Sequence, residues 1–125
     1  YSNPTTKDWD IFQRDYIYMM DAVRGYMMVG ENVERDDIRG QAFNFGMDKP
    51  ATALEVVETL IEISDHPELE PIILDQAQNE IPHQYLASDK AHKLLDWYPE
   101  YDLKAGMKAS FDWYKDYLEE TEPAA

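Results

Sequence analysis

The stretch that decides the fold reads Arg14-Asp15-Tyr16-Ile17-Tyr18-Met19-Met20-Asp21-Ala22-Val23. Aromatic and branched residues, which favour extended backbone, are frequent in residues 12–18. Asp21 then stands where the N-cap of a helix is expected, and residues 22–28 follow as the helix itself. The stretch therefore predicts a strand followed by a helix.

The same order of strand and helix recurs downstream. After a charged loop at residues 31–40, residues 41–46 read as a short strand that a glycine closes. Thr52 and Glu55 then match a capping box, in which each side chain satisfies a backbone N–H of the other residue. A helix is expected over residues 53–64. Its buried face is predicted to comprise Leu54, Val57, Leu60 and Ile61.

The rest of the chain predicts two further extended segments and two further helices. Residues 71–74 and 81–86 read as extended, and Ser88 is expected to cap a helix that ends at Leu95. A last helix is expected to begin at Asp102. Its apolar residues recur every three or four positions and are Leu103, Met107, Phe111, Tyr114 and Leu118. The sequence thus predicts a small, mixed α/β fold with short strands and about four helices.

Composition limits the class of protein. A chain of 125 residues suits one domain, and we expect residues 1–118 to form a lobe and residues 119–125 an acidic tail. An apolar share of 44% is enough to fold. A net charge of −15 repels phosphate backbones and anionic lipids, so neither nucleic acid nor a membrane is expected as a partner. This acidity predicts solubility, with a salt-adapted source as the alternative.

Residues that could carry chemistry are scattered. The chain has no cysteine, which excludes disulfides and thiolate catalysis and fits a cytoplasmic location. His66, His83 and His92 fall in different expected elements, so no metal site is predicted. The five glycines never take the spacing of a phosphate-binding loop. We therefore expect no catalytic residue, no cofactor site and no metal ligand within this chain.

Five features resemble one family. The stretch quoted first resembles the Arg-Asp-aromatic-x-Tyr/His-Val-x-Asp signature in the C-terminal half of extended short-chain dehydrogenases/reductases, the NAD-dependent epimerase/dehydratase family. Residues 42–46 resemble its aromatic-Asn-x-Gly strand, residues 52–57 its capped helix and residues 102–117 its closing helix. Residues 80–97 are most similar to sugar-nucleotide 4,6-dehydratases of the CDP-glucose or GDP-mannose type. The resemblance implies the C-terminal lobe of an extended family member whose Rossmann half is missing.

The resemblance also implies a function. The complete enzyme would be an NAD-dependent sugar-nucleotide 4,6-dehydratase or epimerase, whose N-terminal Rossmann domain binds NAD(P) and carries a Tyr-x-x-x-Lys pair. No tyrosine here has a lysine four positions later, so the chain is expected to be a fragment that is inactive alone. Its implied partners are a nucleotide-sugar substrate and its own N-terminal Rossmann domain, and a homo-oligomer stays open. The alternative is a stand-alone nucleotide-sugar-binding or protein-interaction module derived from this family.

Of the family's functional residues, the one that best matches a position in this chain is at Arg14. In several members of the family its counterpart lies near the substrate diphosphate. A guanidinium fork suits phosphate oxygens. The alternative is that Arg14 pairs with a neighbouring acid such as Asp15 or Asp10. Asp21 is expected to be a helix cap rather than a ligand.

Residues 77–80 complete the expected substrate-binding set. Ala77 stands where many relatives carry a second diphosphate-binding arginine. Gln78 and Asn79 are candidates for a weaker replacement, and Glu80 is placed with them in the substrate-binding set. The sequence departs from the family again at Asp96, which replaces the usual glycine before a tryptophan.

Overall fold

The structure is a computed structural model and describes residues 12–74 and 80–121. Within these residues there are four helices and three short strands, which confirms the predicted small, mixed α/β fold. In chain order they are β1 (Gln13–Arg14), α1 (Met19–Glu31), β2 (Ala51–Thr52), α2 (Ala53–Ile63), β3 (His83–Gln84), α3 (Asp89–Leu95) and α4 (Leu103–Thr121).

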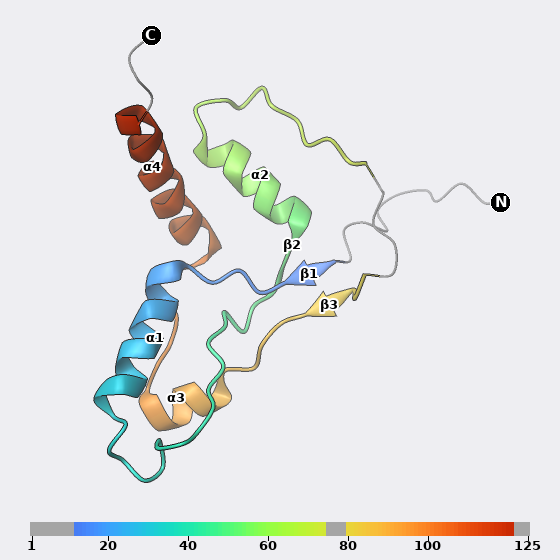
Figure 1. The fold of residues 1–125 in the computed structure, drawn as a ribbon. Helices are drawn as coiled ribbons and strands as arrows, with labels where there is room; N and C mark the ends of the chain where they lie inside the picture. The colour runs from blue at the N-terminus through green and yellow to red at the C-terminus, as the bar shows by residue number, and fades with distance from the viewer. Residues whose placement is uncertain (1–11, 75–79, 122–125) are drawn as a thin grey trace, which may run out of the picture.

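The strands form one sheet in the order β2-β1-β3, with β1 in the centre. β1 runs antiparallel to β2 and parallel to β3, so that Gln13 lies between Thr52 and His83. Helices α2 and α4 lie side by side, while α1 and α3 pack together at the other end (Figure 1). Arg14, at the end of the central strand, is thereby placed next to two segments that are distant in the sequence.

All four predicted extended segments form shorter strands than expected or none. Of residues 12–18 only Gln13 and Arg14 pair as a strand, and of residues 81–86 only His83 and Gln84 do. Residues 41–46 and 71–74 form no strand. A strand needs a neighbour that accepts its backbone hydrogen bonds, and composition alone does not show whether a segment will meet one. Residues 41–46 instead contribute Phe45, which packs edge-on against Trp97 at a ring-centroid distance of 4.9 Å.

The helix caps were predicted with mixed success. The capping box is confirmed, because the Thr52 N–H donates to Glu55 Oε2 (2.6 Å) and the Glu55 N–H to Thr52 Oγ1 (3.1 Å). Asp102 caps α4 through its bond from the Ala105 N–H (2.8 Å). The prediction for Asp21 was wrong, since α1 begins at Met19 and Asp21 lies inside its first turn. Helix α4 also includes residues 119–121, the first three of the expected tail.

The core is small and lies between α1 and α3. Trp97, Ile38, Ala91 and Leu95 form a buried cluster there. Helix α2 has no buried residue, and Val57 and Leu60 on its predicted core face are 38% and 39% exposed. The predicted burial of that face was therefore wrong. In the described part of the chain, α4 is the helix that packs on α2 and it covers the face only in part.

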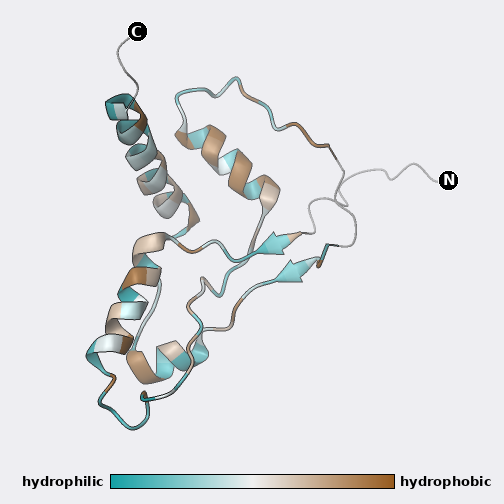
Figure 2. Ribbon diagram, viewed as in Figure 1, coloured by the Kyte–Doolittle hydropathy of each residue, from teal (hydrophilic) through white to brown (hydrophobic). Residues whose placement is uncertain are grey.

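The outer face of α1 is apolar and largely exposed in the described structure. It carries Met19, Val23, Tyr26 and Met27, which share one helix face and are 39–76% exposed. Figure 2 shows hydrophobic residues on α1 and α2, whereas β1 and β3 are hydrophilic. Among the described helices, none combines the length and the apolarity that a membrane crossing requires. This face of α1 is a candidate surface for covering by another polypeptide.

Two aspartates adopt the left-handed backbone conformation, and replacing each by glycine is expected to change the stability in opposite directions. Asp96 (φ 54°) ends α3 and is exposed, so the Asp96→Gly substitution should relieve strain and raise the free energy of unfolding by about 0.5–1 kcal/mol. Asp48 (φ 53°) uses its carboxylate to bind the Ser88 N–H, so the Asp48→Gly substitution should lower it. Urea denaturation of both variants measures the difference, and a loss of stability in Asp96→Gly would contradict the strain.

Candidate functional site

Arg14 is held by contacts on two of its guanidinium nitrogens. Nη1 donates to the carbonyl oxygens of Gln13 (2.8 Å) and Ile81 (2.9 Å), which fixes the plane of the fork. Nη2 donates to Glu80 Oε2 at 3.2 Å. The acid that pairs with Arg14 is therefore Glu80 and not Asp15, while Asp10 lies outside the described residues. The fold brings together two of the four predicted substrate-binding residues across 66 positions of sequence.

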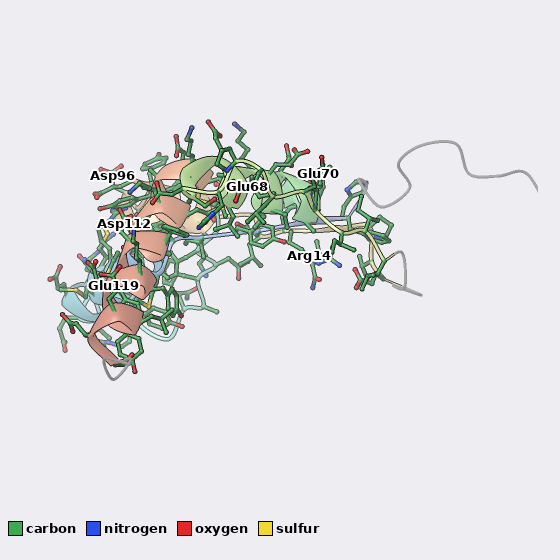
Figure 3. All side chains as sticks on the ribbon, turned by 90° about the horizontal axis from the view of Figure 1, so that it is seen from above. Arg14, Glu68, Glu70, Asp96, Asp112 and Glu119 are labelled. Carbon is green, nitrogen blue, oxygen red and sulfur yellow. The ribbon has the colours of Figure 1, made fainter. Side chains whose placement is uncertain are left out.

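The ion pair is at the surface. The side chains of Arg14 and Glu80 are 29% and 48% exposed. Pairs with this exposure contribute only about 0–1 kcal/mol, so a stronger anion can displace the carboxylate. Figure 3 shows Arg14 on the far side of the molecule from Asp96, Asp112 and Glu119, whereas Glu70 lies toward the same side as Arg14. Acidic residues are therefore present on both sides, and Glu80 is the one that pairs with Arg14.

The rest of the predicted substrate-binding set adjoins Glu80. Gln78 and Asn79 lie outside the described residues, as does Ala77. From Glu80 onward the chain runs beside β1, where the Gln13 N–H donates to the Pro82 carbonyl oxygen (2.7 Å). The side chains of His83 and Gln13 are also in contact, with 3.1 Å between Nδ1 and Oε1. This pairing determines where Glu80 stands relative to Arg14.

Two acidic residues that follow Arg14 in the sequence bind backbone N–H groups. Asp15 accepts hydrogen bonds from the N–H groups of Met47 (2.8 Å) and Leu86 (3.1 Å). Asp21 is 1% exposed and accepts from the N–H groups of Glu100 (2.9 Å) and Tyr101 (3.1 Å). Sequence reasoning missed these roles, because nothing in the sequence shows which distant amides a carboxylate will meet.

Two adjoining cavities lie between the chain that follows β1 and the helices α2 and α4. Their volumes are about 290 and 530 Å³, and Tyr16, Asp102 and Leu103 line both. Lys49 and Lys104 also line the smaller cavity. Arg14 is not among the lining residues of either cavity. The two cavities and the Arg14–Glu80 pair are therefore separate features. Arg14 and Tyr16, two positions apart in the sequence, connect them.

His92 joins α3 to two other segments. Its Nδ1 lies 2.5 Å from the Trp97 carbonyl oxygen, and its Nε2 lies 2.5 Å from Asp48 Oδ2. Both partners can only accept, so both ring nitrogens must carry a proton for both bonds to form. The Trp97 carbonyl is the largest cause that raises the pKa of His92, and Asp48 and Asp89 add to it while burial opposes it. No three potential metal ligands converge in the described portion of the chain.

The raised pKa predicts a pH dependence of stability. Protonated His92 stabilises the fold fully below its ordinary pKa of 6.5, and this contribution is lost as the pH rises through the raised pKa of the folded state. Urea denaturation of the chain at several pH values should therefore show stability falling above pH 6.5. The variant His92→Gln should lack this fall. An equal fall in both proteins would assign it to other groups.

Comparisons with known proteins give the same relatives from sequence and from structure. The UDP-glucose 4-epimerase of Halalkalibacterium halodurans is 28% identical over 105 residues, covering 83% of this chain and 31% of that protein. The human dTDP-D-glucose 4,6-dehydratase is 26% identical over 106 residues, covering 82% of this chain and 30% of that protein. The chain is homologous to sugar-nucleotide epimerases and dehydratases. It spans about a third of the length of these relatives, and no family model matches it.

Solved structures of two such enzymes share the fold of this chain. A UDP-glucose 4-epimerase from Thermotoga maritima, solved with UDP-glucose, matches 91% of the chain with a TM-score of 0.72 and 23% identity. A dTDP-glucose 4,6-dehydratase from Bacillus anthracis, solved in complex with NAD, matches 90% with a TM-score of 0.66 and 21% identity. The chain covers 35% and 34% of these structures. Because epimerases and dehydratases both match, the CDP-glucose or GDP-mannose type stays a prediction.

Proposed function

We propose that this chain is the substrate-side lobe of an NAD-dependent sugar-nucleotide 4,6-dehydratase or epimerase, and that Arg14 binds the diphosphate of the nucleotide sugar. The observation that carries the proposal is the set of partners that the Arg14 guanidinium binds. Two backbone carbonyls fix its plane, while its remaining contact is a partly exposed carboxylate. A cation held in this way is ready for an incoming phosphate.

The exchange of partners at Arg14 can be followed atom by atom. A diphosphate oxygen would take the place of Glu80 Oε2 as acceptor for Nη2, while Nη1 keeps its two carbonyl partners. The Glu80 carboxylate, once released, can accept a hydrogen bond from a hydroxyl group of the ligand. Gln78 and Asn79 are proposed to contact the ligand from the segment just before Glu80.

The remaining chemistry is proposed to come from outside this chain. NAD(P) and the Tyr-x-x-x-Lys pair are assigned to an N-terminal Rossmann domain, and this chain contributes substrate binding and orientation. The exposed apolar face of α1, with Met19, Val23, Tyr26 and Met27, supports such a partner domain. Covering a face of this kind stabilises an assembly, and ligand sites are common at such domain interfaces.

Titration of the 125-residue chain with nucleotide sugars tests this proposal. NMR spectra should be recorded with UDP-glucose, dTDP-glucose, CDP-glucose and GDP-mannose, because spectra detect weak binding. We expect shifts at Arg14 and Glu80 with at least one of them, and none with glucose, which lacks the diphosphate. Spectra that stay unchanged with all four ligands would refute the diphosphate role of this lobe.

A protein-interaction module is the second candidate, and a surface on α4 favours it. Trp113 and Tyr117 stack at 5.2 Å, and with Tyr114 and Leu118 they form a patch that is 49–61% exposed. Sedimentation equilibrium distinguishes the two candidates. If the Trp113→Ser substitution converts an oligomer to a monomer without changing ligand binding, the patch serves association. A monomer that binds nucleotide sugar supports the first proposal.

A further inference from the structure

The segment that carries Glu80 is held against the sheet by polar contacts. Residues 80–87 are all exposed, so burial of apolar surface contributes little to their position. Strand β3 supplies only two paired residues. What remains are the contacts to three consecutive residues of the central strand and its extension, Gln13, Arg14 and Asp15. The position of Glu80 therefore depends on these few bonds.

Arg14 and Asp15 act on opposite ends of this segment. Consecutive side chains of an extended chain point in opposite directions. Arg14 holds the beginning of the segment through the Ile81 carbonyl and Glu80. Asp15 holds its end through the Leu86 N–H, with Oδ2 at 3.1 Å. Loss of either contact leaves one end of a solvated segment without its side-chain anchor.

The second oxygen of Asp15 fixes a third segment at the same place. Oδ1 accepts the Met47 N–H at 2.8 Å, next to Gly46. A Cβ atom on Gly46 would lie 2.2 Å from Asp15 Oδ2, so a side chain at this position would displace the carboxylate from its two amide partners. The Gly46 N–H in turn donates to the buried Ser88 Oγ (2.8 Å). Asp15 thus closes a junction between the end of β1, residues 46–47 and residues 86–88.

We propose that Asp15 is a positioning residue for the Arg14–Glu80 pair: by anchoring Leu86 and Met47 it holds the segment 80–86 where Arg14 can present its fork to a nucleotide-sugar diphosphate. Asp15 itself does not touch the ligand. Its two oxygens both accept hydrogen bonds from backbone amides, and the carboxylate that pairs with Arg14 is that of Glu80. This inference rests on the proposed function for its ligand, and on the geometry above for the role of Asp15.

The test compares Asp15→Asn and Asp15→Ala with Asp36→Asn in the full 125-residue chain. Asn keeps one acceptor oxygen and Ala keeps none, so binding of the best nucleotide sugar should weaken slightly in the first and about tenfold in the second. Asp36 is fully exposed on a loop and its substitution should change nothing. If Asp15 acts through Arg14, Asp15→Ala should cause no further weakening when Arg14 is already alanine. An equal loss with and without Arg14 would overturn the inference.

A measurement without ligand separates this inference from the proposed function. The Met47 and Leu86 amides should lose protection from hydrogen exchange in Asp15→Ala, and the guanidinium NMR signals of Arg14 should shift. If the wild-type chain binds no nucleotide sugar, the proposed function fails, whereas shifted Arg14 signals still support the positioning role. Unchanged Arg14 signals in Asp15→Ala would overturn it, whatever the ligand result.

Discussion

The Arg14→Ala variant is expected to bind nucleotide sugars about ten- to a hundredfold more weakly than the wild-type chain, because hydrogen bonds to charged groups contribute about 1.5–3 kcal/mol. The side chain is 29% exposed, which places the expected loss toward the lower end of that range. The fold should survive, since Arg14 is not part of the buried core. Titration followed by NMR measures the affinity, and urea denaturation of the same sample measures stability.

Two further variants make this result specific. Arg39 is also paired with a carboxylate, Glu34 at 3.2 Å, but it is 59% exposed on the loop after α1. Arg39→Ala should therefore leave ligand affinity unchanged while removing the same charge. Glu80→Gln should tighten binding of the diphosphate, because it removes the negative charge that competes for Nη2. If Arg39→Ala and Arg14→Ala weaken binding equally, the effect comes from net charge and the proposed site is wrong.

The helices were the part of the fold that the sequence predicts well. Local chemistry decides them: Thr52 and Glu55 form their capping box within one turn, and Asp102 caps α4 three residues from its partner. The strands depend instead on distant partners. Residues 41–46 have the composition of a strand but pair with none, and their Phe45 packs on Trp97 instead.

The candidate site was predictable only where a family resemblance supplied it. Arg14 and Glu80 were singled out in that way, and the fold brings them within 3.2 Å of each other. The anchoring roles of Asp15 and His92 were not predictable, since their partners lie between 5 and 71 positions away and include backbone groups. In a sequence with 26 acidic residues, nothing indicates which carboxylates will accept hydrogen bonds from backbone amides.

Asp21 is expected to be the carboxylate on which stability depends most. It is buried and accepts hydrogen bonds from Arg24 (3.1 Å) and from the N–H groups of Glu100 and Tyr101, which lead into α4. Its backbone carbonyl also accepts the indole N–H of Trp97 at the centre of the core (3.0 Å). Removing the carboxylate leaves the N–H groups of Glu100 and Tyr101 without their acceptor. It also takes one ion-pair partner from Arg24, which keeps Glu100 and the Tyr98 carbonyl.

The Asp21→Ala substitution should therefore lower the free energy of unfolding by about 3 kcal/mol, which a lobe with so small a core can barely sustain. Asp21→Asn, which retains one acceptor oxygen, should lose less. Asp112→Ala is the matched control, because that carboxylate pairs with Lys108 on the exposed side of α4 and its loss should cost less than about 0.5 kcal/mol. Urea denaturation followed by circular dichroism ranks the three variants. If Asp21→Ala unfolds at the same urea concentration as Asp112→Ala, the buried carboxylate does not hold α4 in place.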